Sequence, residues 1–130
     1  MKYHYTTGVN AEKILADKYI RPTELYLLRR ERGVAWFTTR ATYEPTALPV
    51  WQDLQTKIRK DLTLTEAAEL GGGLWRFGVP DDHQQHSHLY PWLKICRLAR
   101  TPKKAQLALQ HSARKMGSDP YTYWGSLSPI

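Results

Sequence analysis

The sequence predicts an α+β fold, a single compact domain in which a split, mixed β-sheet is flanked by peripheral helices. Three segments rich in β-branched and aromatic residues carry this prediction, because such composition is typical of strands: residues 2–6, 34–39 and 74–79. Apolar residues at helical spacing lie between and after these segments. The chain has 130 residues and neither a linker nor an internal repeat, so we expect one domain, residues 1–130, around one core.

The first part of the chain is expected to form a strand, a helix and a second strand. The strand at residues 2–6 is followed by a helix that opens at Asn10, a favourable N-cap residue, and ends near Lys18. Residues 34–39 predict the second strand, because they combine β-branched and aromatic side chains.

The middle of the chain is expected to add helical turns and a third strand. Trp51, Leu54 and Ile58 lie at positions i, i+3 and i+7, which favours a helix. Residues 63–70 match a capping-box pattern and stop at three consecutive glycines, which we interpret as a helix end and a turn. The alternating residues 74–79 then predict the third strand.

The last third of the chain is expected to be mainly helical and to end in a strand. Pro91 fits the first turn of a helix, but the residues after it also alternate as a strand would, so both interpretations stay open. A helix is expected from Pro102 to Gly117, with one apolar face. Residues 121–124 (Tyr-Thr-Tyr-Trp) predict a final strand that packs against the domain.

Composition limits the classes of protein to which the chain can belong. Nineteen Lys and Arg against twelve Asp and Glu give a net charge of +7, which attracts polyanions such as nucleic acids or the phosphates of a nucleotide. A single cysteine, Cys96, excludes a disulfide framework within the chain and a zinc site built from cysteines. The sequence shows no apolar run of membrane-spanning length and no signal peptide, so we expect a cytoplasmic protein without membrane contact.

Three histidines lie close together at His83, His86 and His88. Alternation on a strand would let two of them chelate a metal ion, but no acidic residue or cysteine accompanies them at a known ligand spacing. We therefore expect an exposed polar loop and no metal.

Polar side chains next to aromatic ones mark the first two strands as a candidate site. His4, Tyr5 and Thr6 lie on the first strand, and Trp36 and Thr38 lie on the second. Polar groups and rings on adjacent strands are the usual lining of a small-ligand cleft. The sequence therefore predicts a ligand site across these two strands.

The order of these segments resembles the ADP-ribosyltransferase fold. It consists of a strand with an early histidine (residues 3–7, Tyr-His-Tyr-Thr-Thr), a short capped helix, an extended turn at residues 20–22 and the Trp-Phe-Thr-Thr strand at residues 36–39. The similar branch has a histidine on its first core strand and includes diphtheria-toxin-like, poly-ADP-ribose-polymerase-like and rifampin-ADP-ribosyltransferase-like proteins. The resemblance covers about the first 47 residues and includes Tyr43 after the second motif.

The resemblance implies that NAD is a co-substrate and that ADP-ribose is transferred from it to a macromolecular or small-molecule acceptor. In the family, the histidine binds the nicotinamide ribose and the adjacent backbone holds the carboxamide, roles that would fall to His4 and Tyr5. Arg76 is expected to bind the pyrophosphate. The complete set of expected NAD-binding residues is His4, Tyr5, Thr6, Trp36, Thr38, Thr39, Tyr43 and Arg76.

The chain departs from the family in its catalytic carboxylate. The family carries a Glu or Asp on a late strand, whereas the late segment here offers only Asp119, just before Pro120. Glu44 is the other candidate, although it follows directly after the second motif. The catalytic candidates are therefore His4, Glu44 and Asp119, and the alternative is a domain that keeps the cleft without transferring ADP-ribose.

Two interpretations of other classes stay open. The first is a non-enzymatic basic module that binds nucleic acid or an acidic protein partner through its charge and its aromatic residues. The second is a small inhibitor or accessory protein, for instance of a phage or toxin system. A relative that transfers a 2′-phosphate from RNA to NAD would also suit the positive charge, but its several-arginine pattern is not evident.

Overall fold

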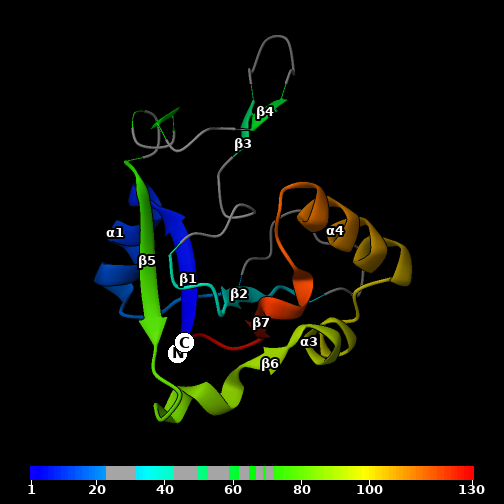
Figure 1. The fold of residues 1–130 in the computed structure, drawn as a ribbon. Helices are drawn as coiled ribbons and strands as arrows, with labels where there is room; N and C mark the ends of the chain where they lie inside the picture. The colour runs from blue at the N-terminus through cyan, green and yellow to red at the C-terminus, as the bar shows by residue number, and fades with distance from the viewer. Residues whose placement is uncertain (23–31, 43–49, 53–58, 62–64, 67–68, 70–71) are drawn as a thin grey trace.

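Five antiparallel strands form the main sheet, in the order β5-β1-β2-β7-β6 (Figure 1). The computed structural model describes residues 1–22, 32–42, 50–52, 59–61, 65–66, 69 and 72–130. The sheet strands are β1 (Lys2–Thr7), β2 (Ala35–Thr38), β5 (Leu74–Val79), β6 (Tyr90–Pro91) and β7 (Tyr123–Ser126). A separate two-stranded sheet pairs β3 (Val50–Gln52) with β4 (Arg59–Asp61).

Three α-helices of the described part accompany the sheet: α1 (Gly8–Asp17), α3 (Trp92–Leu98) and α4 (Lys103–Lys115). Two short 3-10 turns, η2 (Gln84–His88) and η3 (Pro120–Thr122), precede β6 and β7. The α+β class and the small single domain are thereby confirmed. Within the described residues, no helix combines the length and the apolar character needed to span a membrane.

The sheet divides into two parts that meet at one pair of residues. β1 pairs with β5 over six residues and β2 pairs with β7 over four, but β1 and β2 share only the Tyr3–Thr38 pair. In Figure 1, β1 and β5 run in a clearly different direction from β2 and β7. The predicted mixed sheet is wrong for the described strands, because every pairing is antiparallel: the connection through α1 brings β2 back against β1 instead of crossing over in parallel.

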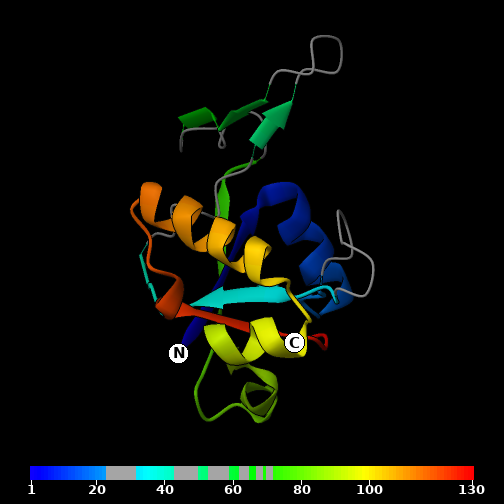
Figure 2. The same cartoon turned by 90° about the vertical axis from the view of Figure 1, so that its right-hand side faces the viewer.

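The two faces of the sheet carry different layers. Figure 1 shows α1 and α4 on opposite sides of β1, and Figure 2 looks onto the side of α3 and α4, with β2 and β7 visible between these helices. We call these sides the α1 face and the α3/α4 face. Because side chains alternate along a strand, β2 sends Phe37 to the α1 face and Trp36 to the α3/α4 face.

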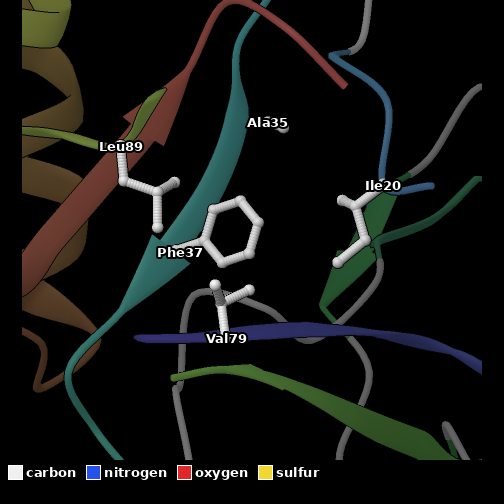
Figure 3. Close-up of a cluster of buried hydrophobic side chains, with 5 residues drawn as sticks. All are labelled: Ile20, Ala35, Phe37, Val79 and Leu89. Carbon is white, nitrogen blue, oxygen red and sulfur yellow. The ribbon is translucent and has the colours of Figure 1, made fainter. Parts of the chain in front are cut away.

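The α1 face holds the main hydrophobic core (Figure 3). Its buried members come from a loop, the strands β2 and β5 on either side of β1, and the segment before β6: Ile20, Ala35, Phe37, Val79 and Leu89. A second, smaller cluster of Val34, Ile95 and Ala99 packs between β2 and α3 on the other face.

The start of α1 differs from the prediction. The helix begins at Gly8 rather than at Asn10, and its N-cap is Thr7. The backbone N–H of Gly8 donates to the carbonyl of Gly73, so a contact with the glycine turn before β5 sets this boundary. The predicted end at Lys18 is confirmed, since Lys18 takes the left-handed conformation that closes the helix.

Other segments depart from the predictions in the middle and at the end of the chain. The predicted helix from Trp51 is wrong at that residue, which belongs to β3, and residues 53–58 lie outside the described residues. Most of the predicted helix at residues 63–70 also lies outside them. Both interpretations around Pro91 hold in part, since it ends β6 and α3 starts at Trp92.

Candidate functional site

A cavity of about 500 Å³ opens on the α3/α4 face, between the strands β1, β2 and β7 and the helix α4. Pockets for small ligands usually occupy roughly 300–1,000 Å³. Most residues that line the cavity come from β1, β2, β7, α3 and α4, and Arg21 borders it from the turn after α1. It is therefore large enough for a ligand of the size of a nucleotide.

Three aromatic rings form one wall of the cavity. Trp36 of β2, Trp92 of α3 and Tyr123 of β7 contact one another, with ring centroids 5.6, 6.4 and 6.0 Å apart for the pairs Trp36–Trp92, Trp36–Tyr123 and Trp92–Tyr123. The rings are tilted or edge-on, as quadrupolar rings prefer. Such a wall offers flat apolar surface to a planar heterocycle.

Trp92 carries an unsatisfied hydrogen-bond donor at this wall. The residue is only 2% exposed, and its indole Nε1 has no partner among the described residues. A buried N–H without an acceptor costs free energy, and native proteins rarely tolerate one without a reason. Trp92 sits at the first residue of α3, directly after Pro91, so the helix start fixes the position of the ring.

The opposite wall belongs to α4. Leu109, Ser112, Ala113 and Met116 line the cavity, and their spacing of three, one and three residues places them on one stripe of the helix. Leu109 is 48% exposed and Met116 is 38% exposed. Apolar side chains of the cavity are thus accessible from solvent, and the cavity is open along α4.

His4 borders the cavity from β1, but its ring lies on the α1 face. The imidazole packs against Phe37 with ring centroids 5.4 Å apart, and its Nδ1 lies 2.7 Å from the carbonyl oxygen of Trp36. Because a carbonyl only accepts, Nδ1 carries the proton and donates. Burial lowers the pKa of His4 below its ordinary value of 6.5, although this hydrogen bond opposes the shift, so the ring is neutral at pH 7.

This hydrogen bond lies where the sheet divides. The strands β1 and β2 share only the Tyr3–Thr38 pair, and the bond from His4 to Trp36 adds a second link between them. The hydroxyl of Tyr5 adds a third, since it donates to the carbonyl of Arg40 at 2.7 Å. Both side chains therefore hold the two strands that form the floor of the cavity.

The structure brings some of the sequence-predicted site residues together at the cavity. His4, Tyr5, Trp36 and Thr38 all border it. Tyr43 and Glu44 lie outside the described residues.

The remaining predicted residues lie away from the cavity wall. Thr6 is buried, and the backbone N–H of Thr39 donates to the carbonyl of Thr122. The exposed guanidinium of Arg76 stacks 4.7 Å from the ring centroid of Tyr3, which itself lines the cavity. The carboxylate of Asp119 accepts from the backbone N–H of Tyr121 at 3.0 Å and caps η3.

The sequence prediction missed the residues that complete the wall. Trp92 and Tyr123 were expected only as parts of a helix and a strand, and the stripe of α4 was expected only as a packing face. The available signals were the placement of a Trp directly after Pro91 and the density of rings in residues 121–124. Neither signal says which distant residues the rings would meet.

The charges around the cavity suit an anionic ligand better than a cationic one. Among the described residues that line it there is one cation, Arg21, and no carboxylate. Arg21 forms an exposed ion pair with Asp17 at 3.5 Å, which is a weak interaction that a phosphate can displace. The described wall can thus bind and orient a ligand, whereas a carboxylate for bond cleavage would have to come from elsewhere in the chain.

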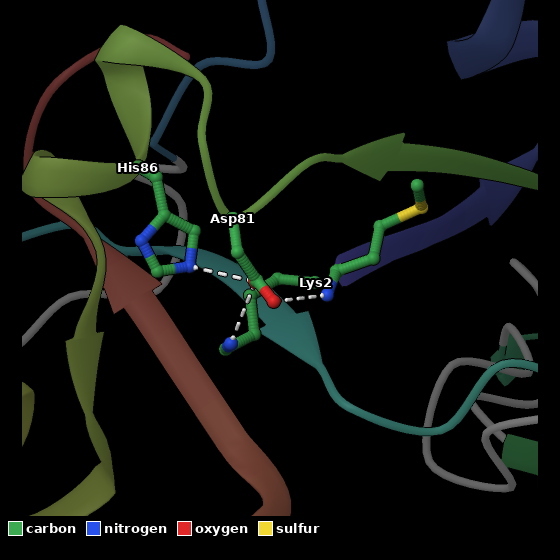
Figure 4. Close-up of polar contacts among 4 residues, drawn as sticks. Lys2, Asp81 and His86 are labelled. Carbon is green, nitrogen blue, oxygen red and sulfur yellow. Dashed lines mark hydrogen bonds and ion pairs between the residues drawn. The ribbon is translucent and has the colours of Figure 1, made fainter.

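The histidine run lies away from the cavity, in and before η2. Figure 4 shows Asp81 between Lys2 and His86, with Lys2 Nζ and His86 Nε2 both 3.2 Å from the same carboxylate oxygen. The N-terminal amine and Lys2 bind this carboxylate and lower the pKa of Asp81 to about 2. Within the described part of the chain, no three His, Cys, Asp or Glu side chains gather closely enough to hold a metal ion.

Comparison with protein-family models, with curated proteins and with solved structures found no match for this chain.

Proposed function

We propose that the cavity binds NAD or a related nucleotide and that the protein transfers ADP-ribose from NAD to an acceptor. The observation that best supports the proposal is the convergence of the two sequence-predicted segments. Tyr5 of β1 and Trp36 and Thr38 of β2 border one cavity of about 500 Å³, although 31 positions separate Tyr5 from Trp36. These segments carry the resemblance to the ADP-ribosyltransferase fold.

The chemistry of the walls fits the parts of a dinucleotide. The rings of Trp36, Trp92 and Tyr123 offer a surface for a flat base, and the indole N–H of Trp92 offers a donor for a ring nitrogen or a carboxamide oxygen. Arg21 at the rim and Arg76 beside Tyr3 are planar cations that suit a pyrophosphate.

The proposed reaction breaks the bond between ribose C1′ and the nicotinamide nitrogen, and the electron pair leaves with nicotinamide. A nucleophilic oxygen or nitrogen of the acceptor bonds to C1′ and releases its proton. The oxocarbenium-like centre requires a nearby negative charge. We assign this role to Glu44, which follows β2, because the carboxylate of Asp119 is engaged in capping η3.

Calorimetric titration of NAD tests the binding step. Trp92→Phe keeps an aromatic ring at the wall but removes the unpartnered N–H together with part of the buried ring, so we expect NAD binding to weaken about three- to tenfold and the free energy of unfolding to fall by about 1–3 kcal/mol. Trp75→Phe is the matched control, because the indole of Trp75 already donates to the carbonyl of Gly72 at 2.9 Å and does not line the cavity. An absence of heat at millimolar NAD would overturn the proposal.

The transfer step is tested separately with labelled NAD. Glu44→Gln is expected to bind NAD as the unchanged protein does and to lose release of nicotinamide by a factor of at least about 100, because the charge near C1′ is lost. Asp119→Asn serves as the comparison and is expected to retain transfer. If the unchanged protein and Asp119→Asn both bind NAD but release no nicotinamide, the domain binds the nucleotide without turning it over, and the proposed transfer is wrong.

A further inference from the structure

The net positive charge of the chain arises from one segment. Residues 83–118 contain seven Lys and Arg and no Asp or Glu. The other twelve basic residues are balanced by the twelve acidic residues of the chain. The net charge of +7 therefore belongs entirely to the segment that folds into η2, β6, α3 and α4.

The structure gathers most of these charges on the outer side of α4. At about 100° per residue, the basic residues of this helix fall within an arc of about 120°. They are all exposed: Lys103, Lys104, His111, Arg114 and Lys115. We call this set the basic arc of α4. The stripe that lines the cavity, from Leu109 to Met116, occupies the other side of the same helix.

Two exposed arginines just before α4 add positive charge close to the arc in the sequence. Arg97, at the end of α3, and Arg100, in the turn, are exposed and lie within seven residues of Lys104. Among the described residues, no ion pair engages these two arginines or the basic arc. Their charge is therefore available to a partner.

We propose that the basic arc of α4 binds the phosphate backbone of a single-stranded nucleic acid. The arc spans about 18 Å along the helix, since each of the twelve steps between the first and the last of its thirteen residues rises by about 1.5 Å. Tyr121, 58% exposed in η3, packs beside α4 and offers a ring on which a base can stack. A basic track that ends at an exposed ring is the usual design of a single-strand site.

The arrangement fits a membrane surface poorly. An interfacial helix must point its apolar side away from its own protein and its basic side toward the lipid headgroups. In α4 the apolar stripe faces the cavity and the sheet, and the basic arc contains one exposed apolar side chain, Leu107. Charge and stacking, rather than insertion, are the interactions this surface offers.

The site lies next to the cavity, on the far side of the same helix. A strand bound along α4 lies one helix width from the cavity and would reach its mouth by passing around the helix, which makes nucleic acid the expected acceptor of ADP-ribose. This last consequence rests on the proposed function, whereas binding to the arc does not.

Fluorescence anisotropy with labelled 20-nucleotide RNA and DNA strands tests the proposal across a range of salt concentrations. Each phosphate contact contributes a slope of about −0.7 in log K against log salt. The double variants Lys103→Gln/Lys104→Gln and Arg114→Gln/Lys115→Gln are each expected to reduce the slope by about 1.4 and to weaken binding about 25-fold near 0.1 M salt. Tyr121→Ala should weaken binding at least about fivefold with an unchanged slope.

Two comparisons make the result decisive. Lys13→Gln/Lys18→Gln removes the same charge from exposed positions in and after α1 and should change binding far less; an equal loss would show that net charge alone is responsible and would overturn the site. Preference for an acidic peptide, or no salt-sensitive binding of either strand, would overturn it too. Trp92→Phe should bind the strands normally, so a failure of the NAD site stays distinguishable from a failure of this one.

Discussion

The two faces of the sheet are built from the same strands but are filled differently. On the α1 face, the side chain of Phe37 is only 2% exposed and packs in a buried hydrophobic cluster, although Phe37 is also among the residues that border the cavity. On the α3/α4 face, its neighbour Trp36 borders an open cavity with other rings and hydroxyls. One residue along the strand therefore separates a side chain that packs into the main core from one that packs against the other rings of the cavity wall, because the pleat sends successive side chains to opposite faces.

We expect the largest effect from substitutions at the neighbouring residues Trp36 and Phe37, which test this comparison directly. Phe37→Ala should lower the free energy of unfolding by about 3–5 kcal/mol, a large share of the roughly 5–15 kcal/mol typical of a domain. Trp36→Ala should cost less stability, because its ring already borders empty space, but should abolish nucleotide binding. Urea unfolding followed by far-UV circular dichroism measures both.

A milder substitution at the same position keeps the test informative if Phe37→Ala does not fold. Phe37→Leu retains most of the buried volume and should stay folded with a smaller loss. Equal losses at Phe37 and Trp36 would show that the α3/α4 face is as tightly packed as the α1 face and would contradict the comparison.

A second, smaller effect distinguishes the packed part of the α3/α4 face from its open part. A methyl group added at Gly125 of β7 would lie 2.6 Å from Val34 Cγ1 and 2.7 Å from Ile95 Cγ1. These side chains belong to the cluster under α3, so Gly125→Ala should cost about 1–3 kcal/mol in urea unfolding.

Gly78→Ala is the matched control for this strand glycine. There the added methyl meets the Met1 Sδ at 2.8 Å, and a flexible methionine end can move away. Equal destabilisation by the two variants would show that strand glycine itself, rather than close packing under α3, determines the cost.

Local patterns predicted the elements whose boundaries depend on local chemistry. The strand at Leu74–Val79 was predicted to the residue, and α4 lies between Pro102 and Gly117 as its spacing indicated. The final strand was displaced by two residues, because Asp119 caps a 3-10 turn at Pro120 before the strand can start. Such capping depends on a few side chains and can shift an element without changing its type.

The complete wall of the cavity could not be predicted from the sequence. Trp36, Trp92 and Tyr123 are far apart in the chain, and they meet only because β2 pairs with β7 and α3 packs against β7. The same holds for the start of α1, which a contact between Gly8 and Gly73 fixes. Long-range pairing of this kind leaves no periodicity in the sequence, so aromatic content predicted a site on β1 and β2 but not its opposite wall.

The smallest expected effect concerns His4, which links the two halves of the sheet. Its pKa is lowered by burial, so the unfolded chain binds a proton more readily than the folded one. The stability that His4 contributes is complete above the unfolded value near 6.5 and is lost as the pH falls from there toward the lower folded value. His4→Asn keeps an N–H donor for the Trp36 carbonyl but cannot gain a proton, so its unfolding free energy should fall less steeply below pH 6.5.

Urea unfolding at a series of pH values measures the slope, and the same substitution at the exposed His111 controls for the loss of a histidine as such. An unchanged slope in His4→Asn would mean that the ring takes up its proton without opening the junction of β1 and β2, and the buried packing assigned to the α1 face would then fail at His4.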